Sequence, residues 1–219
     1  MEKPSTIRLH FVLLVIVSAL TLVDCLPAQA LTTIYNFTAQ STCCGFPTNN
    51  DGSRPVGVIA LGNTLYGTAQ SGGISGIGTV FKVNVDGTGF TVLHYFTNSA
   101  NPLAGLISSG NTLFGTTECC YGSVFAINTD GMAFRTLHFF PFLDSGMSPR
   151  APLVMSGITL YGTSFGATPS FGYQPDPGSV FEINKDGTGF RYLYVFSIFN
   201  SGGAYPQAGL ISSGDTFYG

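Results

Sequence analysis

Residues 110–116 read GNTLFGT, and the chain repeats this stretch three more times. The other copies are GNTLYGT at residues 62–68, GITLYGT at residues 157–163 and GDTFYG at residues 214–219. The glycine that follows the aromatic residue recurs at intervals of 48, 47 and 57 residues. A repeat of this period indicates an architecture in which each copy folds as one supersecondary unit and stacks on its neighbours.

A second motif follows the first in three of the four copies. It reads GTVFKVNVDGTGF at residues 78–90, GSVFAINTDGMAF at residues 122–134 and GSVFEINKDGTGF at residues 178–190. Its apolar residues alternate with the two-residue period of a β-strand. The Asp-Gly pair that follows favours a tight turn, because Asp and especially Gly tolerate a positive φ. The motif therefore predicts a strand that ends in a hairpin turn.

Two further apolar segments complete each repeat. A strand that returns after the Asp-Gly turn is predicted at residues 90–96, 134–140 and 190–196. A short strand that follows a proline and precedes the first motif is predicted at residues 102–107, 149–154, 206–211 and, less clearly, 55–59. Each repeat thus contains four short strands in a fixed order, which is the composition of a β-propeller blade.

The sequence therefore predicts an all-β fold, a β-propeller-like array of four-stranded antiparallel blades. The repeats cover about residues 55–97, 102–140 and 149–197, with a partial repeat at residues 206–219. Residues 31–38 (LTTIYNFT) match residues 90–97 (FTVLHYFT) position by position and predict a fourth strand with no blade before it. Since a ring needs at least four blades, we expect this incomplete array to be a fragment of a longer protein.

The first 30 residues predict a secretory signal peptide, followed by the repeat domain over residues 31–219. A positively charged start precedes an apolar run at residues 9–23, and the AQA sequence that ends at Ala30 offers a cleavage site. The alternative is an uncleaved membrane anchor, although the run is short for a full span. A lipoprotein cysteine at Cys25 is disfavoured, because Asp24 stands where a small residue is needed. We expect a secreted, periplasmic or cell-surface protein with no membrane span in the mature chain.

The composition excludes several classes of protein. Charged residues make up only 9% of the chain, aromatic residues make up 13%, and there are 29 glycines. This combination argues against disorder and suits a β-rich fold with many turns. Eight Lys and Arg stand against 11 Asp and Glu, for a net charge of −3, and the basic residues form no cluster. Nucleic acid is therefore not an expected partner.

Together the motifs resemble the GloVer tandem repeats of exported bacterial proteins. The resemblance rests on Gly-Leu-Ile-x-x-Gly-Asn-Thr-Leu-Tyr/Phe-Gly-Thr, Gly-Thr/Ser-Val-Phe-x-Ile-Asn-x-Asp-Gly and Leu-His-x-Phe, and it covers nearly all of residues 31–219. It implies a propeller-like, surface-associated protein, often with a C-terminal anchoring signal. No enzymatic activity or set of catalytic residues comes with the resemblance, and the sequence predicts no cofactor. No anchoring segment occurs within the 219 residues, so an anchor would lie in sequence missing from this chain.

Four cysteines after residue 30 form two adjacent pairs, Cys43-Cys44 and Cys119-Cys120. In an exported protein we expect them to be oxidised and to form structural disulfides. A cross-link between the pairs and a ring within each pair are both open, because connectivity cannot be read from sequence. Metal binding is less favoured, since the Cys-x2-Cys spacing of zinc sites is absent.

The repeated polar residues are interpreted as structural, and no metal site is predicted. The aspartates of the Asn-x-Asp-Gly motif (Asp86, Asp130 and Asp186) recur without the further oxygen ligands of a calcium loop, so they are expected to form turns. His94 and His138 occupy equivalent positions, and the third copy has a tyrosine there. Because tyrosine does not replace a metal-binding histidine, these rings are expected to pack within strands rather than to bind metal.

We expect a non-catalytic scaffold whose loops bind an unknown protein or carbohydrate ligand. The variable connections between second and third strands lie at residues 69–77, 118–121 and 166–177. Three aromatic residues in or beside the last connection are candidate ligand contacts, or else pack within their own loop: Phe165, Phe171 and Tyr173.

The alternative function is a propeller-type hydrolase or lyase that acts on glycans. Glycoside cleavage needs two carboxyl groups that flank the scissile bond. Glu118, Glu182 and the scattered aspartates form no recognisable pair in the sequence, and no nucleophile or phosphate-binding motif occurs. The sequence therefore predicts no catalytic residue.

Overall fold

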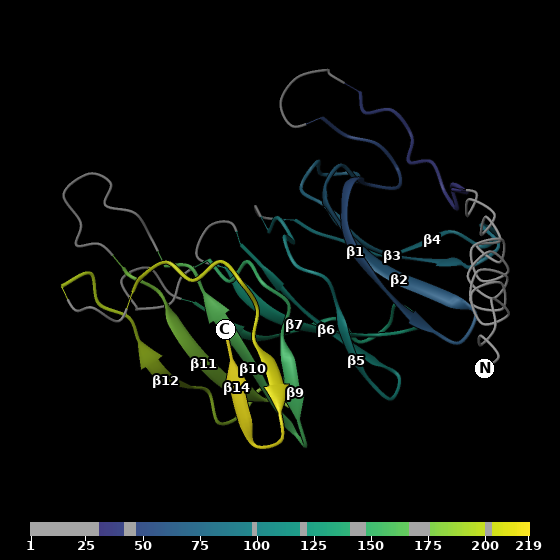
Figure 1. Ribbon diagram of the computed structural model, residues 1–219. Coiled ribbons are helices and arrows are strands. Elements are labelled where there is room, and N and C mark those ends of the chain that lie inside the picture. Colours follow the sequence, from purple (N-terminus) through teal and green to yellow (C-terminus); the bar gives the residue numbers. More distant parts are fainter. Residues whose placement is uncertain are drawn as a thin grey trace, which may run out of the picture. The chain divides into compact units, whose positions relative to one another are not determined.

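The structure is a computed structural model that describes residues 31–41, 47–97, 100–118, 122–140, 148–166, 176–199 and 203–219. Its strands form three four-stranded sheets and one two-stranded sheet (Figure 1). Blade 1 contains β1 (Ser53–Leu61), β2 (Thr64–Ser71), β3 (Thr79–Asn84) and β4 (Thr91–Tyr95). Blade 2 contains β5 (Ile107–Ser109), β6 (Thr112–Thr117), β7 (Ser123–Asn128) and β8 (Arg135–Phe139).

Blade 3 contains β9 (Val154–Ser156), β10 (Thr159–Ser164), β11 (Ser179–Asn184) and β12 (Arg191–Val195). The two-stranded sheet, here called the half-blade, pairs β13 (Ile211–Ser213) with β14 (Thr216–Tyr218). In every blade the strands pair antiparallel in chain order. The predicted order of four strands per repeat is therefore confirmed, and the fold is a β-propeller-like array of blades. The first strands predicted at residues 102–107, 149–154 and 206–211 instead begin at the last residue of each segment, Ile107, Val154 and Ile211. Over the residues described, no helix is long and apolar enough to cross a membrane.

The glycine of the Tyr/Phe-Gly-Thr motif is required by packing inside each blade. It pairs with the phenylalanine of the third strand in the same register each time: Gly67 with Phe81, Gly115 with Phe125 and Gly162 with Phe181. A Cβ atom at these glycines would lie 2.7, 2.6 and 2.5 Å from Cζ of the phenylalanine ring. Non-bonded Cβ atoms do not approach other atoms this closely, so any larger residue would push the ring out of its position.

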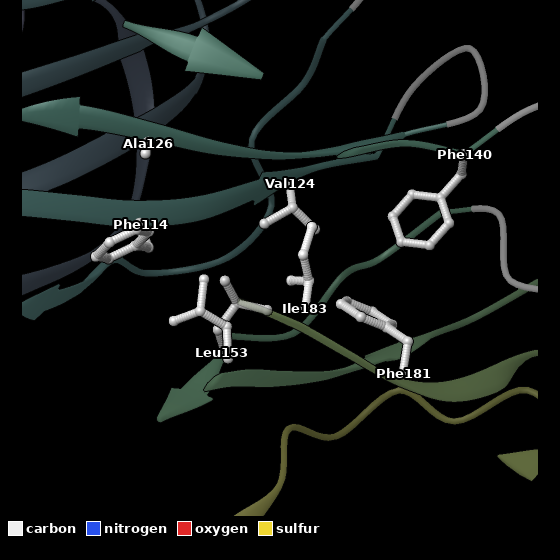
Figure 2. Close-up of a cluster of buried hydrophobic side chains, with 8 residues drawn as sticks. Phe114, Val124, Ala126, Phe140, Leu153, Phe181 and Ile183 are labelled. Atoms are coloured by element: carbon white, nitrogen blue, oxygen red, sulfur yellow. The ribbon is translucent and has the colours of Figure 1, made fainter. Parts of the chain in front are cut away.

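The hydrophobic core lies between successive blades. One cluster joins blades 1 and 2: Tyr66, Val80, Phe96, Leu106, Leu113, Phe125 and Ile127. A second cluster joins blades 2 and 3: Phe114, Val124, Ala126, Phe140, Leu153, Leu160, Phe181 and Ile183. We call the packed interface between two successive blades a seam. Figure 2 shows Val124 and Phe140 opposite Ile183 and Phe181 across the seam between blades 2 and 3. Burying each phenylalanine stabilises the fold by about 1.5–3 kcal/mol, so a blade depends on its neighbour for much of its stability.

The threonine of the same motif links neighbouring blades by a hydrogen bond. Its hydroxyl donates to the carbonyl of an alanine in the segment before the next blade's first strand. The pairs are Thr68 with Ala104 (2.9 Å), Thr116 with Ala151 (3.4 Å) and Thr163 with Ala208 (2.9 Å). Because a buried hydroxyl needs a partner, this bond explains why a polar residue recurs in an otherwise apolar strand.

The N-terminal segment packs against blade 1 in the way that the fourth strand of a preceding blade would. Tyr35 stacks on Phe90 with ring centroids 3.9 Å apart, and Phe37 meets Phe81 edge-on at 5.2 Å. Residues 31–40 belong to no strand. The segment expected to form an orphan strand at residues 31–38 therefore pairs with no other strand among the described residues, although the Tyr35 and Phe37 rings pack as those of a fourth strand would.

A buried carboxylate holds this segment. Asp51 is 4% exposed and accepts hydrogen bonds from the Tyr35 hydroxyl (2.9 Å), the Thr38 amide (2.8 Å) and the Thr38 hydroxyl (2.7 Å). Asn49 donates a further bond to the Thr38 carbonyl at 2.9 Å. Burial, followed by the hydrogen bond to Asp51 and its negative charge, raises the pKa of Tyr35 to about 12.

Candidate functional site

Because the strands pair antiparallel, the connections between them alternate between the two ends of each blade. Each blade therefore has two different ends, here called edges. The hairpins between first and second strands and the Asp-Gly turns between third and fourth strands lie at one edge, here called the turn edge. The connections between second and third strands, and those that lead into the next blade, lie at the other, here called the loop edge. All the connections predicted to be variable therefore belong to the loop edge.

The turn edge is nearly identical in the three blades. The amide of the motif asparagine donates to a carbonyl four residues later at 2.9, 3.0 and 2.9 Å (Asn84, Asn128 and Asn184). Oδ1 of Asp86 accepts from the Thr88 amide at 2.9 Å and the Thr88 hydroxyl at 2.7 Å, and Asp186 does the same with Thr188. These hydrogen bonds lower the pKa of Asp86 and of Asp186. The aspartates thus act within their own turns, as expected of turn residues.

The two repeat-equivalent histidines lie in the seams. His94 stacks on Phe134 with centroids 3.7 Å apart and an interplanar angle of 4°, and His138 stacks on Phe190 at 3.5 Å and 8°. Burial lowers the pKa of His94. Tyr35 makes the same kind of stack on blade 1, so this position takes a flat ring rather than a metal ligand. No three His, Cys, Asp or Glu side chains gather in the part of the chain that the structure describes.

The most distinctive group of side chains lies at the loop edge between blade 2, blade 3 and the half-blade. Nη2 of Arg150 lies 2.5 Å from Oε1 of Glu118, and its guanidinium carbon lies 3.9 Å from the centre of the Phe165 ring. The Phe165 ring lies 5.3 Å from the Tyr205 ring, tilted by 37°. We call Glu118, Arg150, Phe165 and Tyr205 the loop-edge cluster.

Repeated backbone geometry positions this cluster. Glu118 directly follows β6 and Phe165 directly follows β10, and their amides donate to the carbonyls of Asn101 (3.0 Å) and Ser148 (3.1 Å). Each repeat begins with a proline at an equivalent position (Pro55, Pro102, Pro149 and Pro206). The residue before it has a positive φ in every copy, although none is glycine: Arg54, Asn101, Ser148 and Tyr205. Such conformations cost about 1–3 kcal/mol each and persist where the surrounding structure enforces them. The same bend therefore places a different side chain in each blade.

The polar groups of the cluster retain binding capacity. The side chains of Arg150 and Glu118 are 36% and 19% exposed. Within the described residues, the buried Nε of Arg150 has no hydrogen-bond partner. A guanidinium has five N–H donors and a carboxylate accepts several bonds, so one contact between them leaves further donors and acceptors. The cluster can therefore offer hydrogen bonds beside two aromatic rings.

The cluster is specific to one junction. In the repeat, Gln70 stands at the position of Glu118, and Leu103 stands at the position of Arg150. Gln207 is the next equivalent of Arg150. Neither Leu103 nor Gln207 can reproduce an arginine–carboxylate pair, so the junctions share a backbone but differ chemically at the loop edge.

Of the residues predicted from the sequence, Phe165 belongs to the cluster, and its aromatic contact with Tyr205 lies outside its own loop. Glu118, considered as a catalytic acid, is paired with Arg150. Arg150 and Tyr205 were not predicted. The sequence signal that could have found them is that the residues directly before and after the repeated proline differ from one copy to the next. The remaining candidates lie outside the described residues: Cys43, Cys44, Cys119, Cys120, Phe171, Tyr173 and the cleavage site after Ala30.

The stacked four-stranded antiparallel sheets define a β-propeller-like repeat protein. The model of the Gloeobacter/Verrucomicrobia repeat matches residues 27–219, and the chain belongs to this family. No curated protein matches the chain. A chain in the crystal structure of the nidogen/laminin complex has a TM-score of 0.54 and 19% identity, with 80% of this chain and 59% of that chain covered. This chain therefore spans less than two thirds of that neighbour, and the likeness shows the fold alone.

Two further solved structures are more weakly similar. The structure described as TolB from Agrobacterium tumefaciens has a TM-score of 0.43 and 17% identity, covering 68% of this chain and 53% of that one. The computationally designed Ika4 protein has a TM-score of 0.46 and 12% identity, covering 78% of this chain and 88% of that one.

Proposed function

We propose that this protein is an exported, non-catalytic repeat scaffold that binds its ligand at the loop edge. The observation that carries the proposal is the contrast between the two edges of the blades. Turn geometry repeats almost unchanged in three blades, whereas the loop edge carries different side chains at each junction. Invariant contacts suit a rigid support, and variable positions on such a support are where specificity resides.

Export is supported by the N-terminal sequence and by the family. Residues 1–30 have the charged start, apolar run and small-residue site of a cleaved signal peptide, which would leave the repeat domain at residues 31–219. In an oxidising compartment the two cysteine pairs would form disulfides. The net charge of −3 and the absence of a basic cluster in the sequence favour a protein or carbohydrate partner over nucleic acid.

The environment of the glutamates favours binding over catalysis. Each of the two in the described residues is paired with an arginine at 2.5 Å, Glu118 with Arg150 and Glu182 with Arg191. A glycoside hydrolase would need two carboxyl groups aimed at one scissile bond. Two separate arginine pairs serve structure and recognition better than they serve proton transfer.

Substitutions at the two edges test the proposal. The full chain and its variants would be applied to arrays of oligosaccharides and of peptides. Loop-edge variants Glu118→Gln, Phe165→Ala and Tyr205→Ala should weaken the array signals of the parent, whereas turn-edge variants Met132→Ala and Ile158→Ala, both 67% exposed in the parent, should keep them. Loss of signal with the turn-edge variants instead would place binding elsewhere. Release of a cleaved product from a bound oligosaccharide would establish the enzyme alternative.

A further inference from the structure

We propose that the loop-edge cluster is a binding site for a neutral carbohydrate; this inference rests on the proposed function and specifies its ligand class. The cluster lies where β6 and β10 end and where the segments that lead into β9 and β13 begin. Three successive sheets thus contribute to one site. Its members are partly exposed, so a ligand can reach them without a change in the fold.

The charge of the cluster selects against ionic ligands. Arg150 and Glu118 form one ion pair, and their charges cancel. An anionic ligand would have to compete with Glu118 for the guanidinium, and a cationic ligand would have to compete with Arg150 for the carboxylate. Like-charge approach costs free energy in either case. A neutral ligand with many hydroxyl groups meets neither penalty.

The remaining hydrogen-bonding capacity suits sugar hydroxyls. A hydroxyl both donates and accepts, so it can donate to Glu118 and accept from Arg150 at the same time. The pair presents donors and acceptors side by side, as neighbouring hydroxyls on a sugar ring do.

The aromatic half of the cluster supplies the apolar contact that a sugar also needs. Phe165 and Tyr205 lie 5.3 Å apart and are only partly buried. Aromatic faces are electron-rich and attract the C–H groups on one side of a sugar ring. Arg150 covers one face of Phe165 and holds that ring in place, so a sugar would pack on the rest of the aromatic surface that Phe165 and Tyr205 form. A few fixed polar groups beside aromatic surface are the usual make-up of a small-ligand site.

The first junction of the same chain provides a matched control. Gln70 stands where Glu118 stands, and Leu103 stands where Arg150 stands, on the same backbone frame. The proposal therefore predicts one site of this kind at the described junctions, between blades 2 and 3, and none between blades 1 and 2.

Calorimetric titration of the full chain with cellohexaose, mannohexaose and maltohexaose tests this, with oligogalacturonate as the anionic probe and an array of peptides for comparison. At least one neutral hexasaccharide should bind at millimolar concentration. Tyr205→Ala and Glu118→Gln should each weaken it about tenfold, the effect of about 1.4 kcal/mol in binding free energy. Glu118→Gln should also gain oligogalacturonate binding, because Arg150 then lacks its counter-ion. Gln70→Ala should change nothing, and circular dichroism melts should show that each variant folds.

Each other outcome overturns a definite statement. If no neutral hexasaccharide binds, or if Gln70→Ala weakens binding as much as Glu118→Gln does, the carbohydrate site is wrong. If peptides bind instead and Tyr205→Ala abolishes that binding, the loop edge is the binding surface but its ligand class is wrong. If no probe depends on any loop-edge residue, the proposed function fails together with the inference.

Discussion

The seam between blades 2 and 3 and the loop-edge cluster involve the same blades, but the seam uses residues that recur in every repeat and the cluster uses residues that do not. The seam uses residues that recur in every repeat, such as Phe181, whose equivalents are Phe81 and Phe125. The cluster uses Arg150 and Glu118, whose equivalents are Leu103 and Gln70. Agreement between repeats therefore marks what stacks the blades, and disagreement marks where one junction acquires a chemistry of its own.

The largest expected effect is the difference in unfolding free energy between a substitution in the seam and one in the loop-edge cluster. Phe181→Ala removes a fully buried ring from the seam and should lower the free energy of unfolding by about 3–5 kcal/mol, through lost burial and the cavity that remains. Phe165→Ala removes the same ring from a partly exposed site and should cost less than about 1 kcal/mol. Urea denaturation of both variants measures this difference. Equal losses would mean that the cluster is part of the core.

A smaller effect tests the crowding that fixes the seam strands. Gly115→Ala would bring a Cβ atom 2.6 Å from the Phe125 ring, so the ring must shift, at a cost of about 1–3 kcal/mol. Gly105→Ala is the matched control, since a Cβ atom there has no neighbour within 4 Å. Thermal melts should show a clear loss for the first variant and little change for the second. Similar melting temperatures would contradict the requirement for glycine.

The fold followed from the sequence because its signals are local and repeated. The apolar alternation of Val-Phe-x-Val/Ile and the Asp-Gly turn specify strands three times over, and four-stranded blades form in the predicted order. The site was less accessible to prediction. Phe165 was found as an aromatic residue beside a variable loop, but Arg150 reaches Glu118 only because two blades stack. That contact joins residues 32 positions apart, and no local pattern encodes it.

The N-terminal segment extends the comparison, because the buried carboxylate of Asp51 fastens it to blade 1 by hydrogen bonds to Tyr35 and Thr38. Asp51→Asn should weaken the hydrogen bonds to Tyr35 and Thr38 and cost about 1 kcal/mol, expressed as faster amide exchange at residues 34–38. The pKa of Tyr35, about 12 in the parent, should fall toward its ordinary value but stay above it, because burial is the larger cause. Ultraviolet titration of the variant and parent measures the change. An unchanged Tyr35 titration would show that Asp51 does not hold the ring.

The raised pKa of Tyr35 also predicts that the packing of the N-terminal segment on blade 1 loses stability at high pH. A phenol whose pKa is higher in the folded state contributes stability that is complete below about pH 10 and is lost as the pH rises through about 12. The loss should be absent in Tyr35→Phe, which keeps the stack on Phe90. A parent and a Tyr35→Phe variant that lose stability alike over this window would attribute the alkaline limit to other groups.

The smallest effect concerns the equivalent ring in the next seam. Burial lowers the pKa of His94, so the folded state favours the neutral imidazole. Its contribution is therefore present above about pH 6.5, the ordinary histidine pKa, and is lost as the pH falls through the lower folded value. His94→Tyr supplies the control, because Tyr35 already makes the same stack on blade 1 and does not titrate in this range. If melts at about pH 7 and about pH 5 differ by less in His94→Tyr than in the parent, the seams share one ring position and only histidine makes it sensitive to acid. An equal difference in both proteins would mean that protonation of His94 does not reach the seam.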